Sequence, residues 1–384
     1  MSDRGFPVLG DGGGWPVRRM LSLLLGVVLA LTVAACGDDE DAVTTTGAET
    51  TTTVPAETYT ITMGMAHEDV FTSEWWGWLA AREMGYYEDL GLTVEFIGTG
   101  GSGAAVEQMA AGNLDCGNPS MPAVAEALLV GIPLVNVYTY GTGAIFGIFA
   151  LESSGITDIP GLRGKKIGIS EPGGGEVAFL EAALRAAGID PITEATLIPV
   201  GDGGPETYTA IESGEVDAYS SAYNDVFAMQ AQGLTLSDLT PAMFNTFPSR
   251  GIICTPDAVA EKPEAVKRLA RGTAMGTHFC FANLDACEAM MREVIPQVWE
   301  EGPTGDSQGS LRYALAQIQV RPADPMHYGA HNPETTATFI DTIGGTMEDP
   351  EEVDVAAFLF GDFLDYANDF DRAAVEADAQ AYAG

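Results

Sequence analysis

The sequence has little positive charge. It contains 17 Lys and Arg residues against 55 Asp and Glu residues, which gives a formal net charge of −38 over 384 residues. A protein that binds nucleic acid needs clustered Lys and Arg side chains to meet the phosphates. We therefore predict no nucleic-acid partner, and we interpret the acidity as a property that keeps the chain soluble.

The sequence also has few histidine and cysteine residues. Its histidines are scattered, at His67, His278, His327 and His331, and it has no cysteine-rich run. His327 and His331 have the i, i+4 spacing of a metal-binding pair on a helix, but Pro325 and Gly329 disfavour a helix there. We predict no metal site, no cofactor and no catalytic residues.

The N-terminal apolar run, residues 20–35, is too short for an ordinary membrane span. Arg18 and Arg19 precede it and small residues end it, which is typical of a secretory signal peptide over residues 1–35. The run ends Val-Ala-Ala-Cys, which looks like a bacterial lipobox, so we predict that Cys36 becomes the lipidated first residue. Cleavage that leaves Cys36 unmodified is the alternative.

Residues 36–57 have almost no large apolar side chains, which predicts a disordered tether. A lipid followed by a polar tether would hold the folded body at the cell membrane, on its extracytoplasmic face.

The sequence is rich in glycine, and one glycine loop stands out. Residues 92–97 predict a strand, residues 98–103 a flexible loop, and the following residues a helix that ends at Gly112. The loop fits G-x-G-x-x-G, but a strand and a helix in residues 59–90 precede it, whereas a dinucleotide fingerprint normally follows the first strand of its sheet. We expect the free amides of the helix N-terminus to hold a polar or anionic group instead.

The rest of the body alternates strands with helices. Residues 59–140 predict four strands separated by helices, and residues 146–152 predict a further strand. Residues 158–232 predict a second α/β unit with its own glycine loop at residues 173–175. Helical patterns dominate from residue 263 onward. The fold class is therefore α/β, with a mostly parallel sheet flanked by helices in each unit and a cleft between the two glycine loops.

Several stretches in the body carry a family resemblance. They are Gly85-Tyr86-Tyr87 with Gly91-Leu92-Thr93-Val94, Ala110-Ala111-Gly112-Asn113-Leu114-Asp115, Gly161-Leu162-Arg163-Gly164-Lys165-Lys166-Ile167-Gly168, and Glu212-Ser213-Gly214-Glu215-Val216-Asp217-Ala218. Together they resemble the substrate-binding lipoproteins of bacterial ABC importers, in the family that includes sulfonate, nitrate and taurine binders and the thiamine-pyrimidine (NMT1/THI5-like) binders. The resemblance runs from about residue 58 to residue 370.

The resemblance implies a two-lobe fold of the periplasmic-binding-protein type (type II), which closes on its ligand like a hinged clamp. Residues 58–152 and 245–384 would form the first lobe with its C-terminal helices, and residues 153–244 the second. The expected partners are a small organic ligand, either thiamine-pyrimidine-like or sulfonate/taurine-like, and an ABC transporter permease. We predict a binding protein and not an enzyme; a pyrimidine-forming enzyme of the same family and a receptor lipoprotein outside transport are the alternatives.

Ligands of open α/β sheets bind at the carboxyl ends of the strands. The residues expected there are small or polar, with two tryptophans as an aromatic wall: His67, Trp75, Trp76, Gly100, Gly101, Ser102, Asn118, Ser120, Gly173, Gly174, Gly175, Ser221, Tyr223 and Asn224. No lysine lies in these loops, so an anion would depend on amides, hydroxyls and Arg250. This favours a neutral or aromatic organic ligand over nitrate.

Export makes disulfides possible. On one continuous helix Cys280 and Cys287 would lie about 10 Å apart, too far to bridge. Residues 283–285 look like a helix break with a new N-cap, so we predict a disulfide between these two cysteines, with two buried thiols as the alternative. The pairing of Cys116 and Cys254 stays open.

Overall fold

The structure is a computed structural model, and it describes residues 57–300, 327–345 and 347–382. The predicted signal peptide, Cys36 and the tether lie outside the described residues. Within the described ranges, no helix is both long enough and apolar enough to cross a lipid bilayer.

The first of two five-stranded sheets has the order β2-β1-β3-β10-β4. Its strands are β1 (Tyr59–Met65), β2 (Leu92–Gly98), β3 (Cys116–Gly117), β4 (Val135–Thr142) and β10 (Pro248–Cys254). β1 pairs in parallel with β2 and β3, whereas β10 runs antiparallel to both β3 and β4. Strand β10 thus returns to this sheet more than a hundred residues after β4 has left it.

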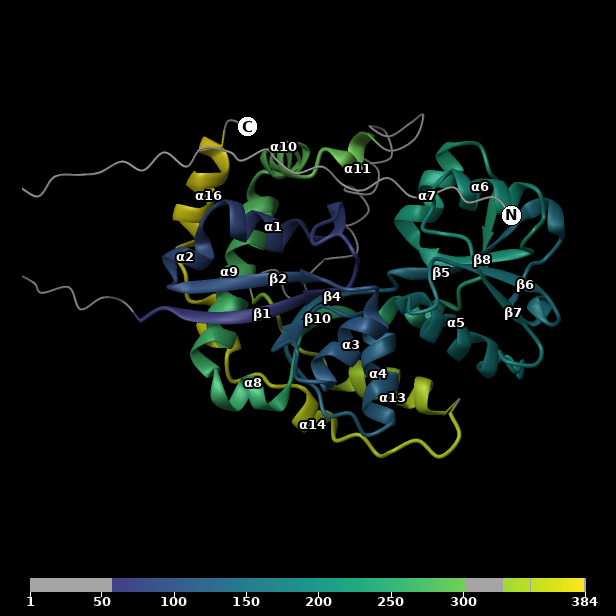
Figure 1. The fold of residues 1–384 in the computed structure, drawn as a ribbon, viewed down its shortest axis with the longest axis horizontal. Coiled ribbons are helices and arrows are strands. Elements are labelled where there is room, and N and C mark those ends of the chain that lie inside the picture. Colours follow the sequence, from purple (N-terminus) through teal and green to yellow (C-terminus); the bar gives the residue numbers. More distant parts are fainter. Residues whose placement is uncertain (1–56, 301–326, 346, 383–384) are drawn as a thin grey trace, which may run out of the picture. The chain divides into compact units, whose positions relative to one another are not determined.

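Helices cover both faces of the first sheet (Figure 1). One face carries η1 (Ser73–Trp75), α1 (Trp76–Glu83), α2 (Tyr86–Asp89), α9 (Pro263–Ala282), α10 (Leu284–Val294) and α16 (Arg372–Ala381). The other carries α3 (Ser102–Ala110), α4 (Met121–Leu129), α13 (Pro333–Gly344) and α14 (Val355–Phe358). We call the part of the fold built on the first sheet its first half, and the part built on the second sheet its second half. The other described helices of the first half are α8 (Pro256–Glu261), α11 (Gln297–Glu300) and α15 (Leu364–Asn368).

The second sheet has the order β7-β6-β8-β5-β9. Its strands are β5 (Phe146–Leu151), β6 (Lys166–Ile169), β7 (Thr196–Pro199), β8 (Ala218–Ala222) and β9 (Leu236–Asp238), and its helices are η2 (Glu152–Ser154), η3 (Ile159–Leu162), α5 (Gly175–Ala186), α6 (Pro205–Glu212), α7 (Tyr223–Ala231) and η4 (Ala242–Thr246). β6 runs parallel to β7 and β8, and β5 runs antiparallel to β8 and β9.

The two-lobe α/β fold is as predicted. The prediction of mostly parallel sheets is wrong, because β10 and β5 each pair antiparallel with two neighbours and make both sheets mixed. The predicted boundary at residue 152 lies after β5, yet β5 pairs with β8 and β9 in the second sheet. We therefore keep the lobe boundaries as a proposal. The pairing of β5 favours a boundary between β4 and β5, where the chain leaves the first sheet for the second.

A close helix crossing positions the start of α1. A Cβ atom added to Gly276 of α9 would collide with the carbonyl oxygen of Gly77, and one added to Gly77 would meet the hydroxyl of Tyr140 at 2.6 Å. Only glycine allows backbones to approach this closely. The crossing anchors the N-terminus of α1 and therefore sets the position of the preceding turn, which carries Trp75.

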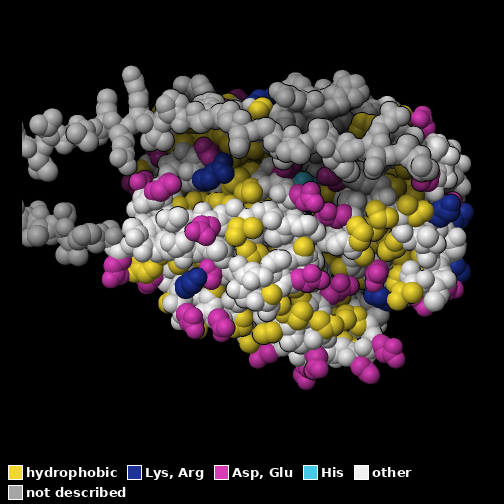
Figure 2. All heavy atoms as spheres, viewed as in Figure 1, with side chains coloured by type: hydrophobic (Ala, Val, Ile, Leu, Met, Phe, Trp, Pro, Cys, Tyr) yellow, Lys and Arg dark blue, Asp and Glu magenta, His cyan; other side chains and the backbone are white. Residues whose placement is uncertain are grey.

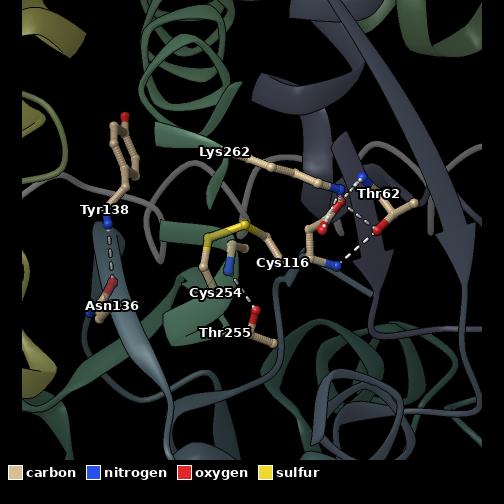
Figure 3. The surroundings of a disulfide bond; sticks show 9 residues. Thr62, Cys116, Asn136, Tyr138, Cys254, Thr255 and Lys262 are labelled. Carbon is tan, nitrogen blue, oxygen red and sulfur yellow. Dashed lines mark hydrogen bonds and ion pairs between the residues drawn. A yellow bond between two sulfur atoms is a disulfide. The ribbon is translucent and has the colours of Figure 1, made fainter. Parts of the chain in front are cut away.

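Two disulfides lie in the first half of the fold. One joins Cys280 at the end of α9 to Cys287 in α10, and the Asn283 side chain caps the new helix by accepting from the amide of Ala286. The other joins Cys116 of β3 to Cys254 of β10 across a sequence separation of 138 residues. Figure 3 shows this second bond beside Thr62 and Lys262, both of which bind Asp115.

Candidate functional site

A cavity of about 440 Å³ lies where strands of the two sheets end. The first half of the fold contributes Ala66, His67, Glu68, Asp69, Thr72, Glu74, Trp75, Gly101, Ser102, Arg250 and Gln297. The second contributes Phe146, Ser170, Glu171, Gly174, Gly175, Glu176, Gly201, Asp202, Ser221, Ala222 and Asp225. Most of these residues follow β1, β2, β6, β7 or β8, so the cavity lies at the carboxyl ends of the strands, where open α/β sheets bind ligands.

The two glycine loops touch each other beside this cavity. The amide of Gly103 donates to the carbonyl oxygen of Gly173 over 3.1 Å. A Cβ atom on Gly175 would collide with the hydroxyl of Ser120, so glycine is needed where α5 meets the first half of the fold. The contact brings a helix start from each half to the same cavity.

Half of the predicted site residues line the cavity. They are His67, Trp75, Gly101, Ser102, Gly174, Gly175 and Ser221. Gly100 and Gly173 lie in the same loops but are not part of the lining. A Cβ atom added to Gly173 would lie 3.3 Å from the carbonyl oxygen of Gly100. The side chain of Asn224 is outside the described part of the structure.

Trp76 and Tyr223 lie away from the cavity. Trp76 is fully buried in the core, with its ring packed edge-on against Phe281. Tyr223 donates its hydroxyl to Asp238 over 2.9 Å, and its ring packs against Phe149. The two tryptophans differ because successive helical positions point in directions about 100° apart, so only one of them faces the site.

Asn118 and Ser120 lie behind the cavity wall, where both are fully buried. The Asn118 side-chain oxygen accepts from the amide of Ala66 over 2.8 Å, and the amide of Ser120 donates to the hydroxyl of Ser102 over 3.1 Å. Both residues therefore hold lining residues in place and do not line the cavity themselves.

The prediction missed the acidic residues of the site. Seven acidic side chains line the cavity, at Glu68, Asp69, Glu74, Glu171, Glu176, Asp202 and Asp225, against one arginine and no lysine in the described lining. The apolar patterns of residues 167–170 and 196–200 predict strands, and Glu171 and Asp202 follow them within two residues. The strand-end rule that selected the glycines and serines could therefore have selected these two residues too. Figure 2 shows that acidic side chains also outweigh basic ones on the face of the molecule in view.

The inner part of the cavity holds a buried guanidinium group. Arg250 Nη2 lies 3.5 Å from a carboxylate oxygen of Glu74. Burial lowers the pKa of Arg250, and the carboxylates of Glu74, Asp225 and Glu176 act in the opposite direction. Glu176 is itself buried, which raises its pKa, although the amide of Ser170 donates to its carboxylate over 2.8 Å.

The outer part of the cavity gathers carboxylates around His67. The hydrogen bond to Asp202, whose carboxylate lies 3.5 Å from the ring, raises the pKa of His67. Burial raises the pKa of Glu171; the charges of Asp202 and Glu68 raise it further and His67 lowers it. Negative charge from both halves of the fold therefore meets at the mouth of the cavity.

The family model described as NMT1/THI5 like matches residues 72–286, which is more than half of the chain. The chain belongs to the NMT1/THI5-like family. This matched range contains all of the cavity lining except four residues at the start of the loop after β1 and Gln297.

Individual relatives agree with this assignment. The chain is 25% identical over 290 residues to the riboflavin-binding protein RibY of Chloroflexus aurantiacus, which covers 73% of this chain and 80% of the relative. A structure from Bordetella bronchiseptica matches with a TM-score of 0.65 at 17% identity, covering 80% of this chain and 96% of that one. The periplasmic aliphatic sulphonate binding protein SsuA of Escherichia coli matches with a TM-score of 0.57 at 15% identity, covering 78% and 91%. The structural matches establish a shared fold.

Proposed function

We propose that this protein is the solute-binding component of an ABC importer and that it captures a small organic molecule in the cavity between its two lobes. The observation that carries the proposal is the cavity itself, because both glycine loops and the strand ends of both sheets contribute to it. Its volume of about 440 Å³ falls within the range of small-molecule sites, which is about 300–1,000 Å³. Family membership and the binding proteins among its relatives support the same class of function.

Of the two ligand classes that the sequence suggested, the cavity favours the pyrimidine-like class over the sulfonates. A sulfonate is a fixed anion, and placing it among seven acidic side chains would cost several kcal/mol unless strong donors compensated. The one arginine already has Glu74 beside it. The ligand is therefore an organic solute that carries no net negative charge.

A catalytic role has less support than binding. All four cysteines in the described residues form disulfides, so none of them offers a thiolate nucleophile. To bind a solute and release it to a permease, the protein requires only the cleft and its hinge.

The location that we propose is the extracytoplasmic face of the cell membrane, with a lipid on Cys36 as the anchor. The proposal rests on the apolar run with small residues before Cys36 and on the polar tether after it. Replacing Cys36 with Ser should move the protein from the membrane fraction to the soluble fraction after cell lysis. A variant that stays with the membranes as firmly as the wild type would contradict the lipid anchor.

Native mass spectrometry of the full-length protein, released from membranes in mild detergent, tests solute capture. We expect a co-purified molecule of small mass that is lost on unfolding and refolding. The same molecule added back should raise the melting temperature, because a ligand that binds only the folded state stabilises it. If no small molecule is retained and none from a broad solute library raises the melting temperature, solute capture is wrong.

A further inference from the structure

The mouth of the cavity presents two carboxylates without partners. Glu68 follows β1 and Glu171 follows β6, so they come from different halves of the fold. Neither side chain makes a hydrogen bond or ion pair with another described residue. Asp202, which follows β7, adds a third carboxylate, shared with His67. Like charges that face each other across a closing cleft repel one another unless something positive lies between them.

Glu171 is the most constrained of the three. Its carboxylate packs against Gly101 of the opposite glycine loop. A Cβ atom added to Gly101, whose φ is +97°, would collide with a carboxylate oxygen of Glu171. Burial raises the pKa of Glu171, and the charge of His67 offsets this only in part, so the ionised carboxylate is incompletely compensated. A bound cation would supply that counter-charge.

The wall of the cavity provides an independent sign of a ligand. Trp75 lines the cavity and is only 2% exposed, yet its indole N–H has no acceptor among the described residues. The same holds for Nη1 of Arg250, whose side chain is 12% exposed. Buried donors without acceptors are costly, and they mark places where a ligand or a water supplies the missing group.

A ligand group that accepts from these donors would have to be neutral. Glu74, Glu176 and Asp225 all act on Arg250, so the local charge around its guanidinium is already negative. A second carboxylate or a sulfonate there would add repulsion, whereas a hydroxyl, a carbonyl or a ring nitrogen would not.

We infer that the ligand is an organic cation with a neutral hydrogen-bond acceptor. Its ammonium, amidinium or guanidinium group lies between Glu68, Glu171 and Asp202, and its acceptor faces Trp75 and Arg250. This inference rests on the proposed solute capture and specifies the class of solute. A bare metal ion does not fit, because no three His, Cys, Asp or Glu side chains of the described ranges converge closely enough to hold one.

Isosteric probes of different charge test the inference on the full-length protein. One set is benzamidine, benzamide and benzoate; the other is choline, 3,3-dimethylbutan-1-ol and 3,3-dimethylbutanoate. The first set keeps a planar group on a phenyl ring while its charge changes from positive through neutral to negative. In the second set the alcohol has carbon in place of the choline nitrogen, and the anion has a carboxylate in place of the hydroxymethyl group. These probes and a library of amines, amidines and guanidines are screened by thermal shift, and calorimetry then measures the affinity of those that bind. We expect cations to raise the melting temperature and their anionic isosteres to leave it unchanged.

Variants then locate the cationic group. Glu171→Gln and Glu68→Gln keep the side-chain volume and remove the charge, and each should weaken the best-binding cation by about tenfold or more. Glu212→Gln, on the exposed face of α6, is the matched control and should leave the affinity unchanged. Trp75→Phe removes the indole donor and should weaken the cations that carry an acceptor more than those that lack one.

The possible results distinguish a failure of the cation assignment from a failure of solute capture. If neutral or anionic solutes bind and no cation does, or if Glu171→Gln and Glu68→Gln bind the best cation as well as Glu212→Gln does, the cation assignment is wrong while solute capture stands. If no solute of any charge binds, solute capture fails and this inference fails with it.

Discussion

At the scale of single residues, the carboxyl group of Glu126 on α4 makes stability depend on pH. Burial raises its pKa to about 7, and the neighbouring Glu181 raises it while Arg185 lowers it. The group titrates near 4.5 when solvated. The folded state therefore binds a proton that the unfolded state has already lost between pH 4.5 and pH 7, so stability falls as pH rises through this window and stays low above it.

Glu126→Gln should remove this dependence. We expect the variant to be more stable than the wild type at pH 8, by up to about 3 kcal/mol, and to differ little near pH 4.5. Urea unfolding of both proteins at the two pH values measures the difference. Glu107→Gln, an exposed carboxylate on the neighbouring helix α3, is the control. A stability gain that is equal at both pH values would contradict the assignment to Glu126 ionisation.

The residues of the site were predictable only in part. The rule that ligands meet the carboxyl ends of strands places His67, Ser102, Gly174 and Ser221 from the sequence alone, because strands and glycine loops are local patterns. Which of two adjacent tryptophans faces the site depends on how α1 packs against α9, and that contact joins segments nearly two hundred residues apart. Arg250 likewise enters the site because β10 returns to the first sheet.

At the scale of elements, local signals place most strands and helices well. The alternating pattern of residues 59–65 predicts a strand, which is β1, and the helical pattern of residues 263–281 predicts a helix that matches α9 to within one residue. The apolar pattern of residues 353–366 predicts one helix, and this prediction is wrong. It contains two short helices, α14 and α15, separated by a segment with Gly361, because leucine and phenylalanine spacing alone does not reveal a break.

Sheet partners were less predictable than the strands themselves. Residues 146–151 have the same apolar character as the strand at residues 135–142, yet they pair in the second sheet. Hydrophobic patterning specifies that both are buried strands and does not specify which sheet each one joins. The same limit applies to the bond between Cys116 and Cys254, whose strands meet only in the folded sheet.

The two disulfides should differ in how much they stabilise the protein. The chain-entropy cost removed from the unfolded state grows with loop length, which gives roughly 5 kcal/mol for the bond between Cys116 and Cys254 and roughly 2 kcal/mol for the bond between Cys280 and Cys287. Their sequence separations are 138 and 7 residues.

Two double variants measure this difference. Cys116→Ala with Cys254→Ala should lower the melting temperature more than Cys280→Ala with Cys287→Ala, in thermal unfolding of the oxidised proteins. Reduced wild type controls for the loss of the sulfur atoms, because it keeps the side chains and loses both bonds. A larger loss from the pair in α9 and α10 would show that local helix packing outweighs loop closure here.

At the scale of the whole molecule, the contact between the two glycine loops defines how closely the proposed lobes approach each other. The amide of Gly103 meets the carbonyl of Gly173, and Gly175 lies against Ser120 and Ser102. These contacts join segments on either side of the cavity, so a clamp that closes on a solute must form them. A side chain at residue 175 would therefore obstruct closure without touching the core of either sheet.

We expect Gly175→Ala to bind solute more weakly than the wild type by about 1–3 kcal/mol, the usual cost of overpacking a tight contact. Gly204→Ala is the matched control, because Gly204 lies at the start of α6 as Gly175 lies at the start of α5, but it has open space where the Cβ would lie. In small-angle scattering with a solute that raises the melting temperature, the radius of gyration should fall for the wild type and for Gly204→Ala and should fall less for Gly175→Ala. A wild type that binds solute without any compaction would contradict the clamp. Equal compaction and affinity in the Gly175→Ala variant would instead show that the glycine contact takes no part in closure.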